Sequence, residues 1–298
     1  MRKRSAQALG RRDGDVLPRL LALLDGPDRH GRYGACEALS QIGPRADAAA
    51  PRLRALLADP DPWLRMLAAR SLPGLGPEAR AAAVPDLLRA ATLADPADPR
   101  RRLVAEVAKA LFALAPGGDG PQPILAKSLA GVDRPALHAA IREVLANEDG
   151  LVRGLAANVY PLLEAEDVRA LLPDIVAAIR RNAPSGEMFR FGIRWAGLDL
   201  LARFRIREGM GLCVDMMNEF EWGAKQDQCL GPLRRYGGAA REVVPRLRET
   251  MVAMREGYAA NQWQKRLGPD TLAIEKLIAE IEADPDPAPV TGIDEFTK

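Results

Sequence analysis

The chain has 298 residues, of which 48% are hydrophobic and 28% charged, and its formal net charge is +2. This composition can form a sizeable core and excludes a mainly disordered chain. No apolar run approaches the roughly 18–20 residues that span a bilayer, and the basic N-terminus lacks the apolar segment of a secretory signal. We therefore expect no membrane association, and a cytoplasmic location if Met1 is the natural start.

Cysteine and histidine usage argues against a metal site and against catalysis. Cys36, Cys213 and Cys229 are far apart, which excludes a disulfide framework and a zinc-ligand pattern. Neither His30 nor His138 is followed by glutamate, and no glycine-rich phosphate loop occurs. We expect no cofactor, no metal and no catalytic residue.

The chain repeats itself at an interval of 33 residues. The segment "GPDRHGRYGACEALSQIGPRA" is followed by "DPDPWLRMLAARSLPGLGPEA", so that Pro18 aligns with Pro51 and Asp28 with Asp61. A third copy begins near Pro85 after a slip of one residue. Such a period is typical of stacked arrays.

Each period has the apolar spacing of two short helices, ended by Asp-Pro or Gly-Pro pairs. Helices this short are marginal alone, and a helical hairpin leaves one apolar face that only the next hairpin can cover. The sequence therefore predicts an all-α, right-handed α-solenoid of about six or seven hairpins.

The turn inside each hairpin carries a second regularity, aspartate followed four residues later by arginine. The aspartate is placed to cap the next helix, and the arginine to reach a carboxylate or carbonyl of the adjacent hairpin. We expect a structural inter-repeat ladder, although a row of arginines could also bind phosphates. Its residues are Asp28, Arg32, Asp61, Arg65, Asp98, Arg102, Asp149 and Arg153.

The stretch "LLADPDPWLRMLAARSLPGLGPEA" resembles a HEAT repeat of the short bacterial, phycobilisome-lyase-like kind. The similarity is specific from about residue 16 to 79 and returns at 233–248, where Gly237 aligns with Gly43 and Pro245 with Pro51. The C-terminal part is similar to the HEAT-array region of uncharacterised bacterial multidomain proteins. The resemblance implies interaction surfaces and no reaction.

Aromatic residues gather beyond residue 183: ten of the fourteen Phe, Tyr and Trp lie there. In "SGEMFRFGIRWAGLDLLARFRIREG" the spacing places Phe191 and Trp195 on one helix face, and the arginines Arg190 and Arg194 lie four residues apart on another flank. The aromatic residues could fill the core, with the arginines solvated, or they could bind a partner or a nucleobase. The candidate binding residues are Arg190, Arg194, Trp195 and Trp222.

Toward the end, "GPDTLAIEKLIAEIEA" predicts a helix over 268–283 with Asp270 as N-cap, and the proline-rich remainder predicts a disordered tail. The predicted organisation is a repeat array over 1–183, divergent repeats of the same solenoid over 184–283, and the tail over 284–298.

Together these features favour a non-catalytic scaffold whose solenoid groove binds a partner protein or another domain of a longer parent chain. The alternative is nucleic-acid binding through an arginine-lined concave face, including a DNA glycosylase-like use of Trp63 and Trp195. The near balance of acidic and basic residues weighs against this alternative.

Overall fold

The computed structural model describes residues 16–93, 101–112, 129–181, 192–219, 227–260, 264–285 and 287–298. Every regular element among them is a helix, apart from one isolated bridge between Ile206 and Thr291. The helices form two compact units, residues 1–168 with 183–190, and residues 169–182 with 191–298. The division therefore falls within one helix, α12.

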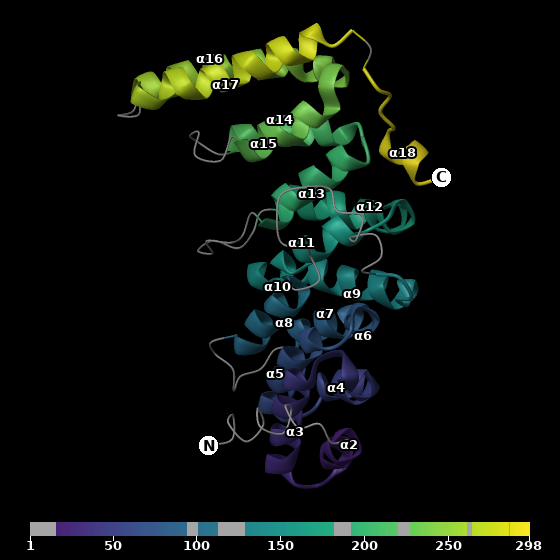
Figure 1. Cartoon of the computed structure of the whole chain (residues 1–298). Coiled ribbons are helices and arrows are strands. Elements are labelled where there is room, and N and C mark those ends of the chain that lie inside the picture. Colours follow the sequence, from purple (N-terminus) through teal and green to yellow (C-terminus); the bar gives the residue numbers. More distant parts are fainter. Residues whose placement is uncertain are drawn as a thin grey trace. The chain divides into compact units, whose positions relative to one another are not determined.

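In the first unit, helices pack as successive hairpins (Figure 1). Helix α3 packs on α2 of its own hairpin and on α5 of the next, and α5 packs on α8. Helix α7 packs on α8 and α9, and α11 on α8 and α9. The helices are α2 Leu17–Asp25, α3 Arg29–Ile42, α4 Ala50–Leu56, α5 Pro62–Ser71, α6 Pro77–Ala82, α7 Val84–Thr92, α8 Arg102–Phe112, α9 Arg134–Ala146, α10 Gly150–Gly154 and α11 Ala156–Val159, with the 3-10 helices η1 Gly43–Ala49, η2 Leu72–Gly74 and η3 Tyr160–Leu162.

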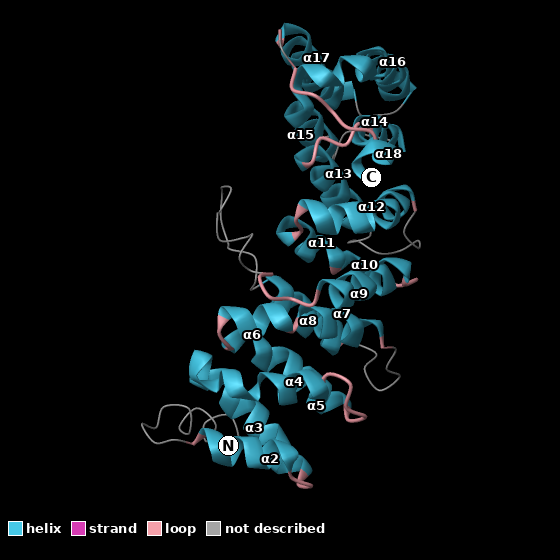
Figure 2. Cartoon of the chain, turned by 90° about the vertical axis from the view of Figure 1, so that its right-hand side faces the viewer, coloured by secondary structure: helices cyan, strands magenta, loops and turns pink. Residues whose placement is uncertain are grey.

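In the second unit, α13 packs on α14 and α15, α14 on α16, and the last long helix, α17, on α15 and α16 (Figure 2). Helix α12 begins in the first unit and continues into the second. The helices are α12 Ala165–Arg180, α13 Gly192–Arg203, α14 Glu208–Glu219, α15 Asp227–Tyr236, α16 Val244–Ala260, α17 Gln264–Ala283 and α18 Ile293–Phe296, with the 3-10 helix η4 Gly237–Val243.

The core of each unit consists of the apolar positions that recur along the repeat. In the first unit Leu39, Leu53 and Leu72 are almost inaccessible to solvent. The small residues Ala35 and Ala68 are equally buried, on helices α3 and α5, which pack against each other. Stacking thus covers the face that a single hairpin would expose, and the all-α solenoid architecture is confirmed.

The two glycines that align between the first and the second unit of the sequence have similar backbone conformations. Gly43 and Gly237 both have positive φ, 77° and 54°, and each opens a 3-10 helix that leads into an α-helix. Residues with a Cβ rarely adopt this backbone conformation, which explains why glycine stands at both positions. The same sequence motif therefore makes the same turn in both units.

Two predictions for the C-terminal region are wrong. Helix α17 begins at Gln264, so Asp270 lies inside it and is not its N-cap. The helix already includes Gly268 and Pro269, so the Gly-Pro pair does not mark its start. Residues 287–298 were expected to be disordered, but they pack against the second unit and end in α18. The inward positions Ile274, Leu277, Ile278 and Ile281 are buried, as the helical spacing predicts.

Candidate functional site

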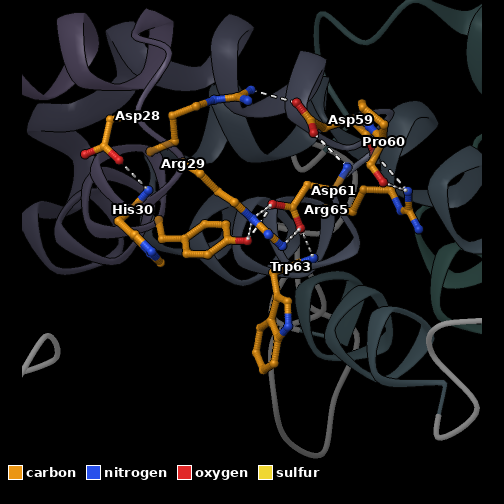
Figure 3. Close-up of polar contacts among 10 residues, drawn as sticks. Asp28, Arg29, His30, Asp59, Pro60, Asp61, Trp63 and Arg65 are labelled. Carbon is orange, nitrogen blue, oxygen red and sulfur yellow. Dashed lines mark hydrogen bonds and ion pairs between the residues drawn. The ribbon is translucent and has the colours of Figure 1, made fainter.

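The best-defined polar cluster surrounds the Asp59–Pro60–Asp61 turn between α4 and α5 (Figure 3). Asp61 is the N-cap of α5 and accepts a hydrogen bond from the amide of Trp63 at 2.9 Å. Asp59 accepts one from the amide of Asp61 at 2.9 Å. These short-range bonds fix the turn because aspartate side chains readily bond to amides two residues later.

Side chains of α3, in the preceding hairpin, donate hydrogen bonds to the same turn. On the Oδ2 atom of Asp61, Arg29 Nε donates at 2.7 Å and the Tyr33 hydroxyl at 2.5 Å. Arg32 Nη2 donates to Asp59 Oδ2 at 2.6 Å. Each carboxylate of the turn is thus held by one or two donors of α3 as well as by an amide of its own turn.

The electrostatics of the turn follow from these contacts. Burial alone would raise the pKa of Asp61, but the hydrogen bonds from Arg29, Tyr33 and the Trp63 amide outweigh it, so the pKa lies below its usual value. Burial and the nearby Asp61 carboxylate raise the pKa of Tyr33. Asp61 is therefore a carboxylate, and Tyr33 a neutral donor to it, at neutral pH.

Trp63 stands on this fixed turn with its ring exposed. It is the second residue of α5, 47% of it is accessible to solvent, and Figure 3 shows its indole pointing away from the polar contacts. Arg102, the first residue of α8 in the next hairpin, places its guanidinium carbon 5.6 Å from the indole centroid. This is within the range of a cation–π interaction. We call Arg29, Tyr33, Trp63 and Arg102 the Trp63 cluster.

A similar arrangement recurs near the end of the first unit. Asp167 is 2% exposed in its side chain, and it is contacted by Arg134 and, at 2.8 Å, by His138 Nε2. Arg134 and His138 are four residues apart on α9, as Arg29 and Tyr33 are on α3. Asp167 also accepts the amide of Glu164 at 3.0 Å, so it organises the start of α12.

The ladder residues occupy the predicted turns, but their partners vary. Asp28 caps α3 by accepting the amides of His30 and Gly31, and Asp149 caps α10 by accepting that of Leu151. Arg32 reaches Asp59 of the next hairpin, whereas Arg65 donates to the carbonyls of Asp59 and Pro60 in its own turn. Arg153 is 2% exposed, and Asp98 lies outside the described residues.

The candidate binding residues of the C-terminal part are not brought together on a described surface. Arg190 and Trp222 lie outside the described residues, and Trp195 is half-buried on α13. Arg194 is 1% exposed; its Nη1 and Nη2 atoms lie 2.6 and 2.9 Å from the two carboxylate oxygens of Glu219, and its Nε donates to the carbonyl of Ile179. These contacts favour the structural interpretation of Arg194.

No sequence motif marks Arg29, Tyr33 or Asp59 as part of a site. The available signal is spacing, because Arg29 precedes Asp61 by 32 residues, close to the repeat period. Within the described part of the chain, no group of three or more His, Cys, Asp or Glu side chains could hold a metal ion. Likewise, none of the helices described is long and apolar enough to cross a lipid bilayer.

The fold and this surface define the chain as an all-α helical repeat protein of the solenoid class. The family described as HEAT repeats matches residues 1–72 and 17–109. This match assigns HEAT repeats to residues 1–109 of the chain.

The other comparisons add little to this assignment. A crystal structure of an engineered protein, a target of the Northeast Structural Genomics Consortium, is 18% identical, with a TM-score of 0.48, and the alignment covers 89% of this chain and 98% of that one. No curated protein matches the chain.

Proposed function

We propose that the protein is a non-catalytic interaction scaffold and that the Trp63 cluster is a contact surface for a partner protein or for another domain of a longer parent chain. The observation that carries the proposal is the exposed indole of Trp63, fixed on a turn that two hairpins hold and flanked by Arg102 of a third. HEAT repeats generally serve as scaffolds for protein interactions, which agrees with this role.

The chemistry of the cluster suits protein recognition. Tryptophan, tyrosine and arginine are the residues most enriched at energetic hot spots of interfaces. A ring held in place before binding loses little conformational entropy when a partner arrives, so more of its contact energy appears as affinity. The hydrogen bonds around Asp61 supply this pre-organisation from the protein side.

The nucleic-acid alternative has less support from the described residues. Arginines of several hairpins pair with carboxylates, including Arg29 with Asp61, Arg54 with Asp86 and Arg70 with Glu106. Binding phosphates at these positions would require the arginines to exchange their carboxylate partners for the ligand. A strong salt dependence of binding would be the signature of such phosphate contacts.

The test is affinity capture from a lysate of the source cells with the full chain as bait, with and without nuclease. Wild type is compared with Trp63→Ala and Arg102→Ala, and with Leu93→Ala as a matched control, since Leu93 is an equally exposed apolar residue of the first unit. We expect a nuclease-resistant protein that wild type and Leu93→Ala retain and that Trp63→Ala loses.

With the captured partner purified, Trp63→Ala should weaken binding by roughly 30-fold or more, as expected of a hot-spot residue. Capture that neither substitution affects would refute the Trp63 cluster as the contact surface. Retention of nucleic acid alone, lost steeply as salt rises, would favour the alternative function instead.

A further inference from the structure

Residues 287–298 lie along the surface of the second unit as a strap. After the end of α17 they return to the turn between α13 and α14, and Figure 1 shows them as the yellow segment that leads to α18. Every residue of the strap keeps some exposure to solvent, and none contributes to the core. Hydrogen bonds and two contacts to the Phe296 ring, and no buried anchor, therefore hold the strap.

The middle of the strap pairs with the α13–α14 turn through main-chain atoms. The amide of Thr291 donates to the carbonyl of Arg205 at 3.0 Å, and the amide of Arg207 donates to the carbonyl of Thr291 at 2.9 Å. This is the hydrogen-bond pattern of a parallel bridge between Ile206 and Thr291. Any extended peptide could offer the same groups, because main-chain pairing does not depend on side-chain identity.

Arg205 holds the first part of the strap with its side chain. Its Nε donates to the carbonyl of Pro289 at 2.8 Å and its Nη2 to that of Ala288 at 2.5 Å. The same guanidinium donates to the carbonyls of Arg235 and Tyr236 at the end of α15. Arg205 has a φ of 54°, a conformation uncommon outside glycine, so its position is imposed by its surroundings.

Side chains of the second unit contact the last part of the strap, helix α18, at both of its ends. Both carboxylate oxygens of Glu208 accept the amide of Ile293 at 3.1 Å, which caps the helix. Arg169 Nε donates to the carbonyl of Phe296 at 2.9 Å, and its guanidinium lies 5.6 Å from the Phe296 ring. The ring also meets Phe204 edge to face, with centroids 6.1 Å apart.

We propose that Arg169, Phe204, Arg205 and Glu208 form a peptide-binding site, that the strap is its intramolecular occupant, and that the site binds an acidic peptide of a partner when the strap is displaced. The strap itself defines this ligand: an extended residue, then a helical turn with two acidic residues, Asp294 and Glu295, and an aromatic residue at its end. Arg169 and Arg205 donate to backbone carbonyls of the strap, and together with Glu208 they give the site a net charge of +1, opposite in sign to the acidic turn.

An external peptide can replace the strap if the strap dissociates, and two features control this: the weak contacts of the strap and its short covalent connection (the tether) to α17. A segment held mainly by surface hydrogen bonds can dissociate without disrupting the core. The tether gives it an effective concentration in the millimolar range, so a peptide added in trans must compete with it. Weakening the strap should therefore expose the site to an external ligand.

The test uses a fluorescently labelled synthetic peptide of residues 287–298, with its C-terminus amidated so that it carries no extra charge. The peptide is titrated into the wild-type full chain and into the full chain with Thr291→Pro and Phe296→Ala. These two substitutions remove the strap's amide donor and its ring contacts. We expect the doubly substituted chain to bind the peptide at least tenfold more tightly than wild type does.

Specificity is tested in the doubly substituted background. Adding Arg205→Ala should weaken peptide binding at least tenfold, whereas Arg234→Ala, an exposed arginine paired with Glu280, should leave it unchanged. If Arg205→Ala does not fold by circular dichroism, Arg205→Lys keeps the charge but loses the forked donors, and it should also weaken binding. A peptide with alanine in place of Phe296 should bind more weakly than the natural peptide.

Absence of saturable binding to the doubly substituted chain would overturn the proposal, as would equal binding by wild type or binding that neither Arg205 substitution alters. The proposal is independent of the Trp63 cluster, so Trp63→Ala should leave peptide binding unchanged. Failure of the scaffold function and failure of the peptide site can therefore be told apart.

Discussion

Arg29 Nε lies 2.7 Å from Asp61 Oδ2, although the two residues are 32 positions apart in the sequence. Other ion pairs join residues separated by about one repeat, and they occur in both units. Examples are Asp25–Arg52, Arg54–Asp86, Arg134–Asp167, Asp215–Arg246 and Arg248–Glu282. Arginine–carboxylate pairs outside the predicted ladder residues thus also join neighbouring hairpins. Exposed pairs contribute about 0–1 kcal/mol each, so they align hairpins more than they stabilise them.

Two substitutions of Asp61 should distinguish the contribution of its N-cap hydrogen bond to stability from the contribution of its charge. Asp61→Ala removes the N-cap of α5 and the acceptor of Arg29 and Tyr33, so we expect a loss of about 1–2 kcal/mol in the free energy of unfolding. Asp61→Asn keeps a capping oxygen and should cost less than Asp61→Ala. Urea unfolding followed by circular dichroism measures both. Asp25→Asn is the control, because Asp25 forms an exposed ion pair and should change stability by less than about 0.5 kcal/mol.

The same residue gives a prediction for pH. Because the folded state lowers the pKa of Asp61, its charge stabilises the protein above the ordinary aspartate pKa of about 3.9. That stabilisation is lost as the pH falls through the lower, folded-state pKa. The stability difference between wild type and Asp61→Asn should therefore be constant between about pH 7 and 5 and shrink below about pH 4. A difference that grew on acidification would contradict the assigned contacts.

Removing the carboxylate of Glu219, the ion-pair partner of Arg194, should destabilise the protein more than the loss of an exposed ion pair does. Glu219→Gln leaves a guanidinium that is 2% exposed without its carboxylate. Loss of a charged hydrogen bond to a buried group costs about 1–3 kcal/mol, reduced here because Glu219 itself is 42% exposed. We expect a clear decrease in melting temperature relative to Glu256→Gln, at an exposed position of α16. Equal melting temperatures for the two variants would show that the Arg194 pair does not contribute.

Two helical glycines should respond in opposite directions to alanine. A Cβ at Gly197 would lie 2.5 Å from Cγ1 of Ile179, so Gly197→Ala must push α12 and α13 apart and should cost about 1–3 kcal/mol. At Gly34, in α3, a Cβ meets no atom within 4 Å, so alanine should be neutral or stabilise by up to about 1 kcal/mol through its helix propensity. Thermal unfolding of the two variants tests this packing directly.

The three thiols should be unreactive in the folded protein. Burial raises the pKa of Cys36 and of Cys229 to about 12, and it raises the pKa of Cys213 well above its usual value. The thiolate is the reactive form, so a thiol-directed reagent at pH 8 should label none of them until the chain unfolds. Titration with an aromatic disulfide reagent, with and without denaturant, is the measurement. Rapid labelling of native protein would show that these positions open.

The sequence alone was sufficient for the features that depend on local chemistry. The 33-residue period and the spacing of leucines predicted stacked helical hairpins, because hydrophobic periodicity is a property of each helix by itself. Asp28, Asp61 and Asp149 stand at helix starts because an N-cap bond joins residues two or three apart. Gly237 and Gly43, which align in the sequence, both have positive φ, a conformation that glycine adopts without steric cost.

The tertiary structure decided which side chains meet across hairpins. The sequence leaves two interpretations of Arg194 open, and only the packing of α12, α13 and α14 places its guanidinium against Glu219 and the Ile179 carbonyl. The sequence does not predict an ordered strap, because its prolines and acidic residues lack periodicity and the atoms that bind it belong to Arg205, Glu208 and Arg169, at least 79 positions earlier in the chain. Local spacing fixes which helices form, whereas contacts between distant residues depend on how those helices pack, and no short-range pattern encodes that.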